Sequence, residues 1–158
     1  MHAHNPKNMN SMPTSYHRLL GMAALSFIAM YILMYTMVNS LGNVFPNFNQ
    51  FYMAGLMTMP MIIFELFIMK EMYPKKEWNT IIIIISILAM ILFFMFIREQ
   101  TAISDEQFLK SMIPHHAAAI LMCEKAPIQD PKIKKLCQNI IANQQAEIDQ
   151  MKEILNQK

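Results

Sequence analysis

Charged residues are scarce in this chain of 158 residues: they make up 15% of it, whereas 54% of the residues are of apolar type. The scarcity is uneven, because three long runs within residues 19–97 hold almost no charge and most charged residues follow them. This distribution excludes a soluble globule built around one large core. It predicts a membrane protein with a polar C-terminal part.

The three apolar runs are each long enough to cross a membrane. Each has about 18–20 residues, and a helix of that length spans a hydrocarbon core of about 30 Å. Glu65 is the one charged residue within them. The first run is too long for the core of a signal peptide, and no small-x-small cleavage site follows it. We predict a membrane domain at 19–97 after a polar tail at 1–18, with helices at about 19–39, 51–70 and 80–98.

Lysine and arginine predict the orientation of these helices. The basic residues near one face are Lys7, Arg18, Lys70, Lys75 and Lys76, and the loop at 39–50 has none. The positive-inside rule therefore places the N-terminus in the cytoplasm and residues 99–158 outside it.

A surplus of positive charge is missing from the C-terminal part, because residues 98–158 hold eight basic and eight acidic residues. Binding to nucleic acid is therefore not expected. The chain also lacks a nucleophile elbow, a phosphate loop, a two-cysteine zinc knuckle and a paired-carboxylate motif. We predict that the protein is not an enzyme.

Residues 99–158 are predicted to form an antiparallel two-helix hairpin. Ser104 and Gln107 have the spacing of a capping box, so the first helix should begin near Asp105. Asp130 and Pro131 are suited to the first positions of the second helix. A hairpin of this size buries too little surface to be stable alone. It should lie against another element of the chain or pair with a second copy as a four-helix bundle, and we predict a homo-oligomer, most simply a dimer.

The hairpin carries a candidate metal site around two adjacent histidines. Met112 precedes His115 by three residues and His116 by four, so one sulfur and two imidazoles share one side of a helix. Imidazole binds copper and zinc, and thioether sulfur favours Cu(I) or Ag(I). Pro114 should kink or restart the helix here and tilt both rings towards a common point. Further candidate ligands are Met122 on the same helix and Gln144, Glu147 and Met151 on the facing one.

A structural interpretation stays open for the same residues. The histidines can be ordinary, partly exposed polar residues, and methionine is a common core filler. Cys123 and Cys137, the only cysteines, can form a disulfide, stay as buried thiols or act as soft ligands, and the first two are favoured.

The segment 105–155 resembles the bacterial family named after domain of unknown function 305. The resemblance is carried by M-x-P-H-H-x-x-A-I at 112–120, D-P-x-I at 130–133 and Q-x-x-E-I-x-x-M at 144–151. It implies a ferritin-like helical fold, and some periplasmic members with repeated units bind copper through histidine and methionine. This chain has one such unit, which supports oligomerisation. Its apolar helices resemble a membrane-anchored branch, which implies a bacterial inner membrane with the hairpin in the periplasm.

Other features of the chain have competing interpretations. Met30, Met34 and Met37 in the first run, with Met53, Met57, Met59 and Met61 in the second, form either a sulfur lane for Cu(I) or a compositional bias among 18 methionines. Glu65 either packs at a helix interface or binds a proton or cation. The tract with His2, His4, Met9, Met12 and His17 can bind metal or be disordered.

We therefore expect a membrane-anchored protein that sequesters, senses or delivers a metal ion, copper first and silver or zinc next. The alternatives are a structural or interaction protein whose hairpin is an oligomerisation module, and a metal transporter.

Overall fold

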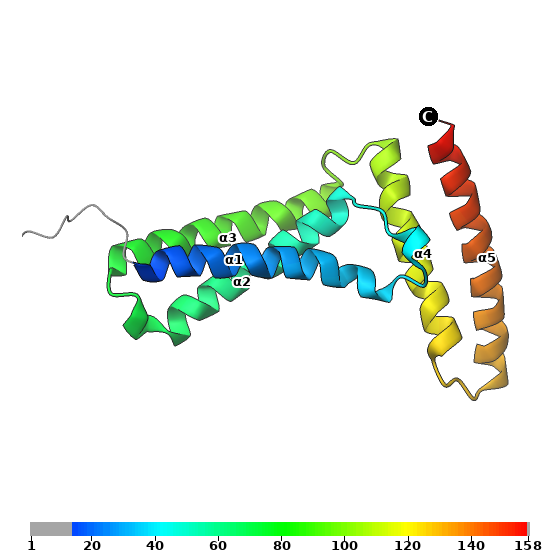
Figure 1. Cartoon of the computed structure of the whole chain (residues 1–158), viewed down its shortest axis with the longest axis horizontal. Coiled ribbons are helices and arrows are strands. Elements are labelled where there is room, and N and C mark those ends of the chain that lie inside the picture. The colour runs from blue at the N-terminus through cyan, green and yellow to red at the C-terminus, as the bar shows by residue number, and fades with distance from the viewer. Residues whose placement is uncertain (1–13, 158) are drawn as a thin grey trace, which may run out of the picture.

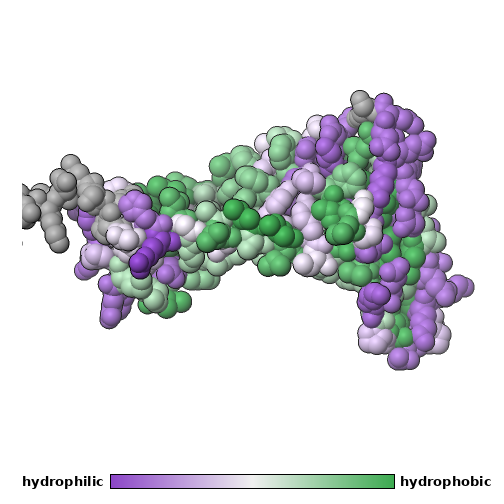
Figure 2. Space-filling view, in the orientation of Figure 1, coloured by the Kyte–Doolittle hydropathy of each residue, from purple (hydrophilic) through white to green (hydrophobic). Residues whose placement is uncertain are grey.

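The computed structural model describes residues 14–157, and every regular element within that range is a helix. Three long helices form an apolar bundle (Figure 1): α1 (Thr14–Leu33), α2 (Phe48–Ile68) and α3 (Lys76–Glu99). The 3₁₀ turn η1 (Met34–Met37) continues α1. Three helices, α1 with η1, α2 and α3, are long and apolar enough to cross a membrane, and hydrophobic side chains cover much of the bundle surface seen in Figure 2. The first of them starts at Thr14, within the predicted polar tail.

Small side chains let α2 pack closely between α1 and α3. Ala54, Gly55 and Thr58 are all buried on α2. A Cβ atom on Gly55 would lie 2.5 Å from the ring of Phe93 on α3, so this contact requires glycine. The Thr58 hydroxyl donates to the carbonyl of Ala54 at 2.8 Å, which satisfies this buried polar group within α2.

At the end of the bundle that holds the N-terminus of α1, two tyrosines join the helices. The Tyr16 hydroxyl donates to Oδ1 of Asn79 at 2.7 Å, and the Tyr73 hydroxyl donates to Oε1 of Glu65 at 3.1 Å. Burial and the neighbouring Glu65 carboxylate raise the pKa of Tyr73. This hydrogen bond links Glu65 on α2 to the connection between α2 and α3.

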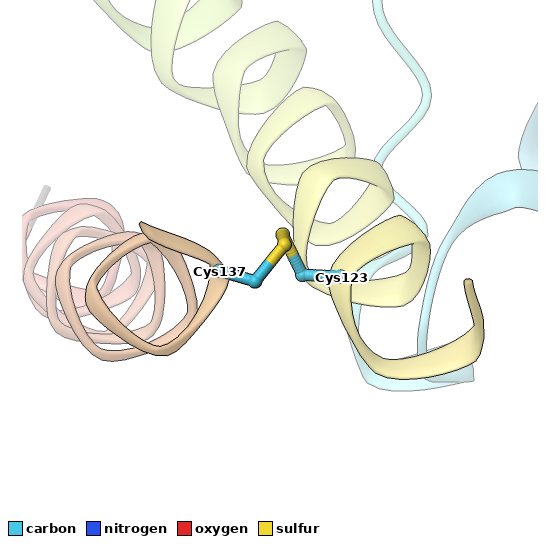
Figure 3. Close-up of a disulfide and its surroundings, with 2 residues drawn as sticks. All are labelled: Cys123 and Cys137. Atoms are coloured by element: carbon cyan, nitrogen blue, oxygen red, sulfur yellow. A yellow bond between two sulfur atoms is a disulfide. The ribbon is translucent and has the colours of Figure 1, made fainter. Parts of the chain in front are cut away.

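The C-terminal hairpin consists of α4 (Asp105–Lys125) and α5 (Pro131–Asn156), which pack against each other. Both predicted caps are confirmed: Ser104 accepts from the Gln107 N–H, and Asp130 accepts from Lys132 N–H at 2.7 Å, with Pro131 at the first helical position. A disulfide between Cys123 and Cys137 closes the connector end (Figure 3). The hairpin core consists of Ile113, Ala117, Ile120, Ile148 and Met151.

The hairpin lies across one end of the apolar bundle, with α4 against it and α5 on the outer side (Figure 1). α4 contacts η1, the short 3₁₀ turn η2 (Leu41–Asn43) and α2. Val38 and Phe45 from the α1–α2 connection pack against the hairpin core. The predicted need of the hairpin for a further packing surface is thus met, at least for α4, within one chain.

Candidate metal centre

His116 faces the inside of the hairpin and joins its two helices. Its Nδ1–H donates to the carbonyl of Met112 at 2.8 Å, and Nε2 lies 2.7 Å from Oε2 of Glu147 on α5. The residue is 8% exposed. Both neighbours are acceptors, so a ring that donates to both carries a proton on each nitrogen. A metal ion would instead take Nε2, while the Met112 carbonyl continues to hold Nδ1–H and fixes the ring.

His115 lies on a different side of α4. Consecutive helical residues are rotated by about 100°, and the two rings lie edge to face with their centres 6.0 Å apart. The side chain of His115 is exposed and lines a cavity between the hairpin and the apolar bundle. α4 runs through Pro114 without a restart, so the two rings do not turn to a common point.

That cavity, which we call the junction cavity, has a volume of about 330 Å³. Four of its lining residues are methionines: Met34 and Met37 from η1, Met53 from α2 and Met112 from α4. Asparagine and glutamine side chains from the start of α2 line the same space, and no carboxylate does. Met112 also packs against the hairpin core, so it stands between the two histidine environments.

The other predicted ligands have separate environments. Met151 is buried in the hairpin core, and Met122 is 52% exposed. Oε1 of Gln144 is buried and has no hydrogen-bond partner among the described residues. Glu147 was expected to face the histidine pair, and it meets His116 alone. The cysteines are bonded to each other, which removes them as thiolate ligands.

The donor set fits a soft cation better than a hard one. Within residues 14–157, no three residues among His, Cys, Asp and Glu gather at one point. A closed zinc site uses four such ligands. The donors that do gather are thioether sulfurs and one imidazole, the set that favours Cu(I) or Ag(I). The candidate ligands His2, His4, Met9 and Met12 lie outside the described residues.

Sequence reasoning did not assign Met34, Met37 and Met53 to this site. Their signal was visible, because Met34 and Met37 are three residues apart and lie near the end of a predicted helix. They were interpreted as part of a possible lane through the membrane. Their convergence with α4 depends on where the hairpin sits, which no local spacing encodes.

Comparison with known proteins places the hairpin in context. A domain of unknown function (DUF305) matches residues 97–156. The chain is also 38% identical over 143 residues to the uncharacterized protein L153 of Acanthamoeba polyphaga mimivirus, which covers 89% of this chain and 92% of that protein. No solved structure matches the chain.

Proposed function

The chain belongs to the family of the domain of unknown function DUF305, and on that premise we propose that it is a membrane-anchored protein that binds copper. Its three apolar helices anchor the hairpin, and the hairpin presents the histidine pair where it meets the bundle. The role is sequestration, sensing or delivery of the ion rather than catalysis.

One observation supports this function above the others. Met112 and His115, one helical turn apart, both line an open cavity, while His116 is held by a backbone carbonyl as metal-binding histidines commonly are. Thioether and imidazole together are suited to Cu(I), with Ag(I) as its closest substitute. Copper and silver are therefore expected to bind more tightly than zinc.

The hairpin is proposed to lie on the non-cytoplasmic side of the membrane. Two independent features agree on this. The connection between α2 and α3, which carries Lys70 and Lys75 and leads into Lys76, lies at the end of the bundle opposite the hairpin (Figure 1). The disulfide is of a kind that persists in oxidising compartments. The sequence predicts a bacterial inner membrane. One relative belongs to a virus. We therefore propose that the hairpin lies on the oxidising side of a membrane, and this membrane need not be bacterial.

A structural role is the second candidate, and the contact between His116 and Glu147 favours it. This contact joins α4 to α5 inside the hairpin without any metal. Ile133 and Leu136 on α5 are also about half exposed, at 48% and 56%. An apolar α5 surface of this kind would suit a homodimer that completes a four-helix bundle. Light scattering of the purified chain would reveal a dimer.

Metal binding is tested with the purified full chain in detergent. Cu(I), Cu(II), Ag(I) and Zn(II) are each titrated in competition with a chromophoric chelator, beside the double variant His115→Ala/His116→Ala. We expect Cu(I) and Ag(I) to bind the natural chain at least tenfold more tightly than the variant. Equal affinity of the two proteins for all four ions would refute the proposed function.

A further inference from the structure

We infer that the junction cavity is a binding site for a monovalent soft cation, Cu(I) or Ag(I), with donors from both halves of the molecule. The donors are Met34, Met37, Met53, Met112 and His115. This inference rests on the proposed function and deepens it, because it moves the site from the hairpin alone to the junction between hairpin and bundle.

Short helical spacings set these donors along the wall of one cavity. Met34 and Met37 are three residues apart on a 3₁₀ turn, where residues at that spacing eclipse each other. Met112 and His115 have the same spacing on α4 and share one face of it. Met53 is in the second turn of α2. Each pair therefore presents two donors towards the same cavity, and the single residue adds a fifth.

The elements around the cavity are fixed to one another, so the backbone segments that carry the donors are in place before an ion arrives. The Tyr35 hydroxyl, within η1, donates to the carbonyl of Phe45 at 2.9 Å. Gln107 on α4 accepts from the N–H of Phe48 at 3.0 Å. A site whose ligands are already positioned loses little conformational freedom on binding, which raises affinity.

The methionines that line the cavity are not all enclosed. Met37 and Met53 are 48% and 39% exposed, whereas a methionine that fills a core is enclosed, as Met151 is at 9%. His115 and the amide side chains of Asn49 and Gln50 line the same space, so the cavity is not a wholly apolar surface. The sulfurs therefore stand around a cavity that an ion can enter.

Charge decides which ions fit. No acidic residue among 14–157 lines the cavity, so every donor is neutral when His115 is unprotonated. A site without negative charge compensates a single positive charge more easily than a double one. Thioether sulfur has the same preference, since it selects Cu(I) and Ag(I) over Zn(II) and Cu(II).

The site also predicts a link between the ion and the assembly of the molecule. Its donors come from η1 and α2 on one side and from α4 on the other. An ion bound there holds the hairpin on the bundle. An ion that binds the folded state alone raises thermal stability, and the gain grows with the logarithm of the ratio of ligand concentration to Kd.

The test compares two triple variants that each remove three sulfurs. Met34→Leu/Met37→Leu/Met53→Leu changes the cavity, and Met57→Leu/Met59→Leu/Met61→Leu changes methionines of α2 that do not line it. Leucine keeps the apolar character and approximate volume of methionine. Ag(I) affinity is measured by competition, and the unfolding temperature is measured with and without Ag(I).

We expect the cavity variant to lose at least tenfold in Ag(I) affinity and to lose the rise in unfolding temperature, while the control variant retains both. Full affinity in the cavity variant would overturn the inference, and would leave the proposed function standing with its site elsewhere in the hairpin. No Ag(I) or Cu(I) binding by the natural chain would overturn both. If the cavity variant does not fold, the single change Met53→Leu in otherwise natural chain is measured for the same loss against Met57→Leu.

Discussion

Nδ2 of Asn47 lies 3.4 Å from the carbonyl oxygen of Lys110 and donates to it. In a regular helix this carbonyl would accept from the backbone N–H of residue 114, but Pro114 has no N–H. The orphan acceptor of α4 is therefore satisfied from the start of α2. The same Asn47 caps α2, because its Oδ1 accepts from the Gln50 N–H at 3.0 Å. The Asn47 side chain thus caps α2 and also links the hairpin to the bundle.

Two substitutions of Asn47 separate these roles. Asn47→Asp keeps the cap but cannot donate to the carbonyls of Lys110 and Phe45 or to Oε1 of Gln50. Asn47→Ala loses these contacts and the cap as well. We expect Asn47→Ala to lower the free energy of unfolding by about 2 kcal/mol and Asn47→Asp by about half as much. Thermal unfolding in detergent, followed by circular dichroism, measures both. Equal and negligible effects would show that Asn47 does not join the two halves.

The two histidines should respond differently to alanine substitution. His116 is buried and bridges Met112 to Glu147, so His116→Ala should destabilise the fold by about 1–3 kcal/mol. His115 is exposed, so His115→Ala should change stability by less than about 0.5 kcal/mol while weakening Ag(I) binding at least tenfold. Unfolding and competition titration of each single variant measure this. The reverse pattern would contradict the assigned positions.

Removal of the disulfide should destabilise the hairpin. Cys123 and Cys137 are 14 residues apart, with their Cα atoms at 5.2 Å, and closure of a loop of that length contributes about 3 kcal/mol. Cys123→Ser/Cys137→Ser should lower the unfolding temperature by a corresponding amount. In intact cells, both thiols should react with maleimide only after reduction. Rapid reaction without reductant would place the hairpin in a reducing compartment.

Two glycines provide a matched test of packing in the bundle. A Cβ atom on Gly55 would overlap the Phe93 ring, whereas a Cβ atom on Gly21 meets nothing within 4 Å. We expect Gly55→Ala to cost about 1–3 kcal/mol through overpacking, and Gly21→Ala to be neutral or slightly stabilising because alanine favours helix. Thermal unfolding in the same detergent measures the stability of both variants. A tolerated Gly55→Ala would mean that α2 and α3 lie further apart.

Local chemistry explains what could be predicted from the sequence. Capping at Ser104 and Asp130 depends on a side chain and an amide only two or three residues away, so the pattern alone locates both helix starts. The apolar runs similarly indicate helices long enough to cross a membrane. The contact between His116 and Glu147 could be predicted only roughly. A hairpin centred near residue 128 would set α5 residues near 145 level with Met112, whereas the His116–Glu147 contact shifts the facing residues further along α5.

The position of the hairpin on the apolar bundle could not be predicted from the sequence, because it depends on contacts between residues that are far apart in the chain. Gln107 has the position to complete a capping box, yet its Oε1 accepts from Phe48 N–H, 59 residues away. Ile113 and Ala117 on α4 are fully buried, whereas Leu136 on α5 is 56% exposed. α4 packs against α5 on one side and against the apolar bundle on the other. Its buried residues therefore do not form the single apolar stripe of a helix that packs on one side only. The cavity and its methionines follow from that packing.

X-ray absorption at the copper edge tests the central claim most directly, because it identifies the atoms bound to the ion. The full chain is loaded with one equivalent of Cu(I), beside Met34→Leu/Met37→Leu/Met53→Leu. The natural chain should show a first shell dominated by sulfur with one nitrogen, and the variant should lose most of that sulfur signal. A first shell of nitrogen and oxygen alone, unchanged by the variant, would contradict a thioether site at the junction.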